Sequence, residues 1–440
     1  MQKDTSGAER SRFSWWMSSP AVALACVFVA LSKAAAQTPA EVPLDGLKNP
    51  NASIRRKAAS DLGKTRSPEA VSRLVELVRD PDVDVRLAVL RAIASIRELT
   101  GVPSMVVFMA DSQARVRKDA IDGVVEIYTR RDRPRASAFL SIFSDNREKP
   151  EPLLVTAVDL EVYRSLAALL KDPDLGVRES AAEAIGILGG TEVAADLASA
   201  TRDALPEVRA AAVTALVKVG TSADGEAIVP LIKDSSASVR RRAIRALGSL
   251  RVIDAAADLR KLFERTPDSE DGIDALMTLG QLAQVSDRPL FQRLALQPDP
   301  RRRRPGIEGL ARLGDKGNEA RFKRDFQREK NDELRAAYAF AIFAFGDRPF
   351  LDTVVLGLSG PKDRARQSKD YLEELGAKML PEILDYLKET DPKIRAGLCD
   401  ALSAAGVVDA LGSIEPLVKD KDQGVAERAT RAVTVLRRAH

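Results

Sequence analysis

The sequence predicts an all-α solenoid of about 13 stacked helix pairs. An arginine that follows a small aliphatic residue recurs at intervals of 31 residues, and a period of this length is typical of solenoid repeats. Within each period, apolar residues recur at the spacing of one helix face. Aromatic residues make up only 5% of the 440-residue chain, as expected for close-packed helices lined by alanine, valine and leucine.

The repeat is clearest in residues 79–96 (RDPDVDVRLAVLRAIASI) and 171–188 (KDPDLGVRESAAEAIGIL). We call the recurring arginine of each repeat its phase arginine. The clear phase arginines are Arg55, Arg86, Arg117, Arg178, Arg209 and Arg240. The double interval of 61 residues after Arg117 predicts a degenerate repeat near Arg147. Looser repeats are expected near Asp271, Arg302, Arg335, Arg366, Arg395 and Ala426.

Each repeat is expected to contain two helices. In the second repeat, the apolar stripe of residues 69–78 forms the first helix, and the turn at residues 80–82 ends it. Asp82 or Asp84 can cap the second helix, which begins near Val85. Small residues lie three and six positions after the phase arginine, as Ala181 and Ala184 do after Arg178. They predict that successive second helices pack closely.

The pattern D-P-D-x-x-V-R-x-x-A-x-x-A-[IL]-G resembles the HEAT repeat, and its length resembles the short HEAT-like repeat of phycobilisome lyases. The resemblance covers residues 45–440, with divergent repeats near 130–165 and 255–380. It implies a right-handed solenoid whose second helices line the concave side, and a scaffold that binds other proteins. Two alternatives remain open: a lyase-like protein that handles a tetrapyrrole (bilin) chromophore, and a nucleic-acid-binding HEAT array.

The first 36 residues are predicted to be a signal peptide, and residues 37–44 a short linker. A polar start with three basic residues precedes the apolar run Ala21–Leu31, and small residues follow at positions 34–36. The 11-residue run is shorter than the ~20 residues that span a bilayer. We therefore expect a periplasmic or secreted protein. The alternative is an uncleaved anchor that holds the protein at the inner membrane, facing the periplasm, and only this alternative involves membrane contact.

The composition argues against an enzyme. The only histidine is His440 and the only cysteines are Cys26 and Cys399, which excludes histidine-based catalytic pairs inside the fold and a disulfide scaffold. We expect no metal, no cofactor and no small-molecule substrate. The formal net charge of +4 is small for 440 residues, so nucleic-acid binding is not expected.

An unidentified protein is therefore the expected partner. Side chains one and five positions after the phase arginine are expected to face outward from the second helices. The predicted protein-binding residues are Leu87, Arg91, Lys118, Asp122, Glu179, Glu183, Arg241 and Arg245.

Other local features have a structural and a functional interpretation. The phase arginines and the aspartates before them predict either a row of anion-binding arginines or a ladder between repeats, and their recurrence in nearly every repeat favours the ladder. The basic run Arg301, Arg302, Arg303 and Arg304 is either an anion-binding patch or a solvated face. Phe340 is either an apolar contact patch or a site of local overpacking. Cys399 is expected to be an inert buried thiol.

Overall fold

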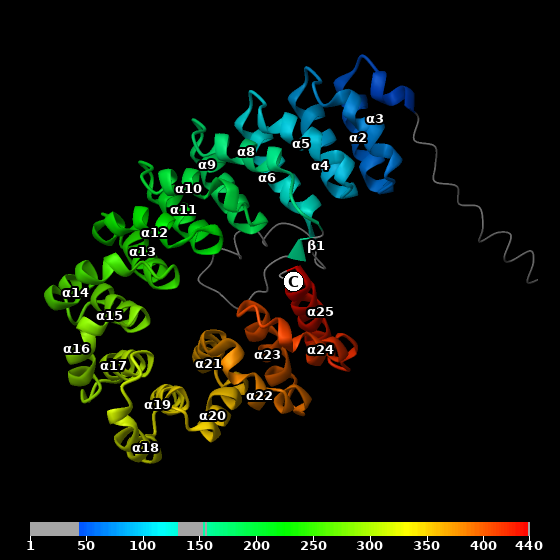
Figure 1. Ribbon diagram of the computed structural model, residues 1–440. Helices are drawn as coiled ribbons and strands as arrows, with labels where there is room; N and C mark the ends of the chain where they lie inside the picture. The colour runs from blue at the N-terminus through cyan, green and yellow to red at the C-terminus, as the bar shows by residue number, and fades with distance from the viewer. Residues whose placement is uncertain (1–43, 131–152, 155, 439–440) are drawn as a thin grey trace, which may run out of the picture. The chain divides into compact units, whose positions relative to one another are not determined.

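The computed structural model describes residues 44–130, 153–154 and 156–438 (Figure 1). The predicted signal peptide, most of the linker and the region around Arg147 lie outside these residues. The chain separates into two units, residues 1–98 and 99–440. Each unit is described by itself below.

The first unit contains two helix pairs. A 3-10 helix, η1 (Leu44–Lys48), precedes α2 (Ala52–Thr65), and α3 (Glu69–Leu74) with η2 (Val75–Leu77) precedes α4 (Val83–Ile96). The two longer helices, α2 and α4, pack side by side. Gly63 of α2 lies so close to Ala92 of α4 that an added Cβ would be 2.7 Å from the Ala92 backbone. The absence of a side chain there lets the two helices approach.

The second unit continues the same plan with ten pairs among its described residues (Figure 1). Its second helices are α6 (Ala114–Tyr128), α9 (Leu175–Leu188), α11 (Pro206–Val219), α13 (Ala237–Ser249), α15 (Glu270–Leu282), α17 (Pro300–Arg312), α19 (Asp332–Phe345), α21 (Lys362–Leu375), α23 (Pro392–Ala404) and α25 (Gln423–Arg438). Each packs against the second helix that follows it in the stack.

The first helices of this unit are shorter, and most join one or two 3-10 turns. They are α5 (Val102–Met109), α8 (Leu160–Leu169), α10 (Ala194–Ala200), α12 (Ser222–Gly225) with η5 (Glu226–Lys233), α14 (Ala256–Arg265), α16 (Arg288–Leu294), α18 (Glu319–Arg328), α20 (Leu351–Leu356), α22 (Leu380–Ile383) and α24 (Leu411–Ile414). Proline inside η5, at Pro230, removes a backbone donor and favours the tighter turns. In the described residues, the only strands are β1 (Thr129–Arg130) and β2 (Leu153–Leu154), an antiparallel pair.

The second helices begin where the sequence predicts. The Asp82 and Asp174 carboxylates accept hydrogen bonds from the backbone N–H groups of Val85 and Val177, both at 3.0 Å. These bonds satisfy donors that the first turn of a helix leaves unpaired. Gly189 ends α9 with φ of 78°, a left-handed conformation that glycine adopts without strain.

The core follows the predicted columns. The alanines three and six positions after the clear phase arginines of the second unit are buried, with at most 2% exposed: Ala120, Ala181, Ala184, Ala212, Ala215, Ala243 and Ala246. Gly186 faces the next helix, where an added Cβ would be 2.9 Å from the Ala215 backbone. Small residues thus set the close spacing of the second helices.

The phase arginines connect successive repeats, as the ladder interpretation predicts. Arg209 donates from Nε to Asp234 at 2.7 Å and from Nη1 to the Asp203 carbonyl at 2.8 Å. The guanidinium lowers the pKa of the Asp234 carboxyl below its usual range. The same pairing joins Arg55 to Asp80, Arg178 to Asp203, Arg240 to Asp271 and Arg395 to Asp420. Because their donors are used within the fold, these arginines do not form a row of anion sites.

The ladder also joins the repeats of Arg117 and Arg178. Arg117 of α6 makes a two-pronged pair with Asp172, with both N–O distances 2.6 Å, and α6 packs directly against α9. The repeat predicted near Arg147 lies outside the described residues. The described residues contain twelve helix pairs.

In three of the looser repeats, the phase position differs by one residue from the predicted one. Asp299 caps α17, so the residue four positions later, Arg303, takes the place predicted for Arg302. Arg303 pairs with Glu329 at 3.3 Å, which is the ladder contact of this repeat. By burial, Gly272 and Ala365 rather than Asp271 and Arg366 stand at the phase position. None of the helices in the described residues combines the length and apolarity needed to cross a bilayer.

Candidate functional site

The surface made by the second helices, one and five positions after the phase residue, is the candidate site. We call it the second-helix face. In the second unit, Lys118 and Asp122 are exposed on this face, as predicted, and Glu179, Arg241 and Arg245 are half-buried. In the first unit, Arg91 is exposed, as predicted. Leu87 and Glu183 do not face outward as expected, because Leu87 is 3% exposed and Glu183 is 6% exposed. Leu87 belongs to the core of the first unit.

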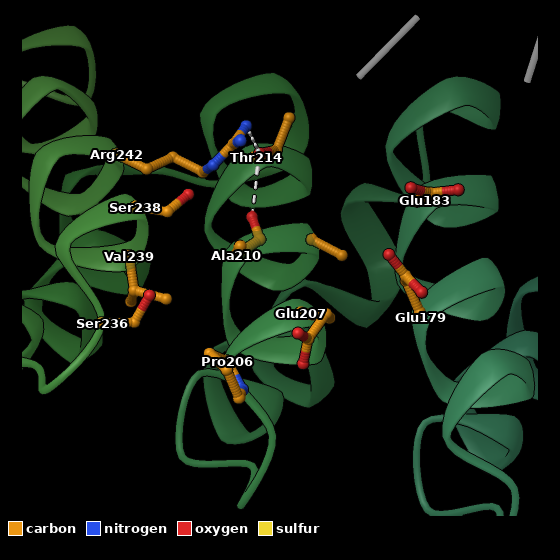
Figure 2. Close-up of a pocket in the computed structure, with 11 residues that line it drawn as sticks. Glu179, Glu183, Pro206, Glu207, Ala210, Thr214, Ser236, Ser238, Val239 and Arg242 are labelled. Carbon is orange, nitrogen blue, oxygen red and sulfur yellow. Dashed lines mark hydrogen bonds between the residues drawn. The ribbon is translucent and has the colours of Figure 1, made fainter. Parts of the chain in front are cut away.

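A pocket of about 350 Å³ opens on this face between α9, α11 and α13 (Figure 2). Its size is near the lower end of ligand pockets in proteins. The lining residues are Glu179, Glu183, Pro206, Glu207, Ala210, Ala211, Thr214, Ser236, Ser238, Val239 and Arg242. The pocket therefore brings together two of the predicted binding residues, Glu179 and Glu183, from α9. The other predicted residues do not line it.

Glu183 is the unusual group in this pocket. It stands one turn after Glu179 on α9 (Figure 2), and within the described residues it has no hydrogen-bond donor and no ion-pair partner. Burial, together with the neighbouring Glu179 carboxylate, raises the pKa of Glu183 to about 8. Lys118 and Arg242 partly offset this effect, whereas Asp122 adds to it.

The opposite wall of the pocket carries a positive charge. Arg242 extends from α13 toward α11, where its Nη1 donates to the Thr214 hydroxyl at 2.9 Å (Figure 2). The Thr214 hydroxyl in turn donates to the Ala210 carbonyl at 2.8 Å. The Arg242 Nε is buried and has no acceptor in the described residues. The pocket thus offers carboxylates on one side and a guanidinium on the other.

The basic run is not a free anion-binding patch. Arg301 pairs with Glu270 at 2.7 Å, and Arg302 pairs with Asp268. Arg304 pairs with Glu308 at 2.7 Å, and Arg303 pairs with Glu329 as described above. Carboxylates of the protein itself therefore neutralise the positive charge of this run, so the run no longer favours an anionic partner.

Phe340 is buried, so the interpretation as an exposed apolar patch is wrong. It is 2% exposed and stacks on Tyr371 of α21, with ring centroids 4.3 Å apart. The Arg312 guanidinium lies over the ring, 5.4 Å from its centroid. Arg312 also pairs with Glu374 of α21 at 2.8 Å. Side chains of α17 and α21 thus meet over α19, and they cover the second-helix face at this place.

Other reactive groups do not form a site in the described residues. Cys399 is fully buried with a free thiol, as predicted, and burial raises its pKa to about 12. No group of three or more histidine, cysteine, aspartate or glutamate side chains is placed to hold a metal ion in this part of the chain.

Sequence reasoning missed three residues of the pocket that carry its polar character: Glu207, Thr214 and Arg242. Glu207 and Arg242 lie two positions from their phase arginines, outside the two columns that were expected to face outward. Thr214 lies in the fifth-position column and could have been found from it. The missed signal is a change of charge along that column, from the acidic Asp122 and Glu183 to the neutral Thr214 and the basic Arg245.

Comparisons with known proteins agree with this architecture. The HEAT repeats profile matches residues 40–141, 157–217, 196–280 and 225–311. No curated protein sequence matches the chain. The finer resemblance to the repeat of phycobilisome lyases stays a prediction.

Among solved structures, an engineered protein is 19% identical, with 90% of this chain and 98% of that chain covered and a TM-score of 0.41. The Escherichia coli protein YibA is 16% identical, with 69% and 100% covered and a TM-score of 0.40. A chain of the Kap95:Nup1 complex is 13% identical, with 95% and 65% covered and a TM-score of 0.48. The profile matches together span more than half of the 440 residues. The chain therefore belongs to the HEAT repeat family.

Proposed function

We propose that this protein is an exported scaffold or adaptor that binds a protein partner through its second-helix face, without a catalytic step. One observation carries the proposal. Three consecutive second helices, α9, α11 and α13, form a pocket with charged groups that the fold does not fully pair. Elsewhere, at the phase arginines and at the basic run, charges are paired internally. Stacked repeats present extended surfaces of this kind to partners.

The export part of the proposal rests on the N-terminal sequence. The short apolar run and the small residues at 34–36 favour cleavage after Ala36. Cell fractionation and N-terminal sequencing of the native protein test it. A periplasmic or secreted chain that begins at Gln37 is expected. A chain that keeps Met1 in the membrane fraction would instead favour the uncleaved anchor.

Partner binding is tested with charge reversals on the second-helix face. Arg241 and Arg245 of α13 are half-buried and stand at the predicted binding positions. The double variant Arg241→Glu plus Arg245→Glu is expected to lose the proteins that co-purify with the wild-type chain from the native cell envelope. Quantitative mass spectrometry measures this loss. Because Arg245 also pairs with Asp274 at 3.1 Å, circular dichroism must first show that the variant is folded.

The matched control reverses two charges on a first helix. Lys261 and Arg265 of α14 are exposed, and Lys261→Glu plus Arg265→Glu changes the net charge by the same amount. This variant is expected to retain the partner. Equal retention by both double variants contradicts binding through the second-helix face.

A further inference from the structure

Two glutamates at the same repeat position have opposite surroundings. Glu308 and Glu183 each lie five positions after the phase arginine of their repeats, Arg303 and Arg178. Both are nearly inaccessible, with 2% and 6% of the residue exposed. The comparison between them shows what a buried carboxylate at this position requires.

Glu308 is fully paired. Arg304 donates to one carboxylate oxygen at 2.7 Å, and Arg312 donates to the other at 3.4 Å. The Tyr371 hydroxyl of α21 adds a third donor. Arg304 and Arg312 lie one turn before and one turn after Glu308 on the same helix, so the sequence itself supplies both cations. These charges hold the pKa of Glu308 below its usual range.

Glu183 lacks each of these partners. The residue one turn before it is Glu179, and the residue one turn after it is Ile187. The charged groups that face it are Glu179 on α9, Lys118 and Asp122 on α6, and Arg242 on α13, and none donates a hydrogen bond to it. A buried carboxylate without donors is costly when it is ionised. A cation that enters the pocket would supply the partner that an ionised Glu183 lacks among the described residues.

We propose that the pocket between α9, α11 and α13 binds an arginine side chain of a partner polypeptide, with Glu183 and Glu179 pairing with its guanidinium. The inference rests on the proposed function, because it names the group of the protein partner that this face recognises. A guanidinium fits better than an ammonium, since its planar fork can reach two carboxylates at once. The pocket lining has three carboxylates, Glu179, Glu183 and Glu207, against one guanidinium.

The opposite wall favours a polypeptide over a free polyamine. Arg242 places positive charge there, and it repels a ligand that carries cations along its whole length. A peptide instead has carbonyl oxygens beside its arginine, and these are acceptors for a guanidinium. A basic residue within a peptide therefore matches both walls.

The test is calorimetric titration of the full mature chain with Nα-acetyl-arginine N-methylamide. The matched citrulline compound, which is uncharged, and spermidine serve as comparison ligands. We expect binding of the arginine compound and no binding of the citrulline compound. Because Glu183 is protonated when the pocket is empty, binding near neutral pH should release about one proton. The binding enthalpy should then change with the ionisation enthalpy of the buffer, and the affinity should fall about tenfold per pH unit below about pH 8.

Two variants that each remove one carboxylate show whether binding requires Glu183 itself. Glu183→Gln is expected to abolish both binding and proton release, whereas Glu226→Gln, at an exposed position of η5, should retain both. Thermal melting shows whether each variant is folded. Failure of the wild-type protein to bind the arginine compound, or unchanged binding by Glu183→Gln, overturns the assignment. Tighter binding of spermidine than of the arginine compound also overturns it, in favour of a free polyamine.

The outcome separates this inference from the proposed function. If the arginine compound fails to bind but the Arg241→Glu plus Arg245→Glu variant still loses its partner, the pocket assignment is wrong and the scaffold function stands. If the compound binds and the partner is retained by that variant, the pocket assignment stands and binding through the wider face is wrong.

Discussion

From the burial of Glu183 we predict how strongly the stability of the folded chain depends on pH. Replacing it by glutamine removes the ionisable group and keeps the shape of the side chain. In the folded chain the pKa of Glu183 is about 8, above its ordinary value of 4.5. Below about pH 4 the carboxyl is protonated in both the folded and the unfolded chain. The free energy of unfolding should therefore depend on pH in the same way for wild type and Glu183→Gln in this range.

The sign and the size of the effect follow from this difference. Between the two pKa values the unfolded chain is ionised and the folded chain is protonated, so wild-type stability falls as pH rises. The loss is complete once the pH exceeds the folded pKa. A pKa change from 4.5 to about 8 corresponds to about 5 kcal/mol at 1.36 kcal/mol per unit. Glu183→Gln should therefore become progressively more stable than wild type as pH rises.

Urea unfolding followed by circular dichroism measures this difference. Wild type and Glu183→Gln are compared near pH 5 and near pH 9, and the difference in unfolding free energy should grow by about 4 kcal/mol between them. Glu226→Gln is the control and should show no such growth. A difference between Glu183→Gln and wild type that stays constant with pH would refute the reasoning, because it would mean that Glu183 titrates normally in the folded chain.

Three further substitutions or labelling experiments test the fold. Val208 of α11 is fully buried, so Val208→Asp should lower the free energy of unfolding by about 3 kcal/mol or more, and unchanged thermal melting would contradict the repeat alignment. Asp172→Asn removes the buried partner of Arg117 and should cost about 3 kcal/mol, seen as faster hydrogen exchange in α6 and α9; unchanged exchange would argue against their direct contact. The Cys399 thiol should resist a thiol reagent in the native chain and react after unfolding in urea, and rapid native labelling would argue against its burial.

Much of the fold follows from local rules that a sequence displays. The apolar columns, the aspartate caps and the ladder of phase arginines repeat in nearly every unit, so each copy supports the others. The predicted phase positions are wrong where the repeat pattern is weak. Four consecutive arginines at 301–304 hide the phase position, and only the cap at Asp299 identifies Arg303. The repeat predicted near Arg147 was inferred from an interval alone, and it lies outside the described residues.

The site was harder to predict from the sequence because the burial of a side chain depends on residues in neighbouring repeats. Phe340 stands in a column that is polar in other repeats, yet Tyr371 and Arg312 cover it from α21 and α17. Glu183 and Glu308 have the same chemistry and the same position, but only Glu308 has arginines one turn away on either side. The neighbours of a column position, rather than the position alone, decide whether its charge is available to a partner.

Site-specific photocrosslinking in the native cell shows whether a partner binds the second-helix face. A photoreactive residue is placed at Ala210, which lines the pocket on α11, and in a second strain at Lys261 on the first helix α14. We expect a crosslinked partner from position 210, lost when Glu183→Gln is added, and none from position 261. Crosslinks to the same partner from position 261 alone, or equally from both positions, would contradict it.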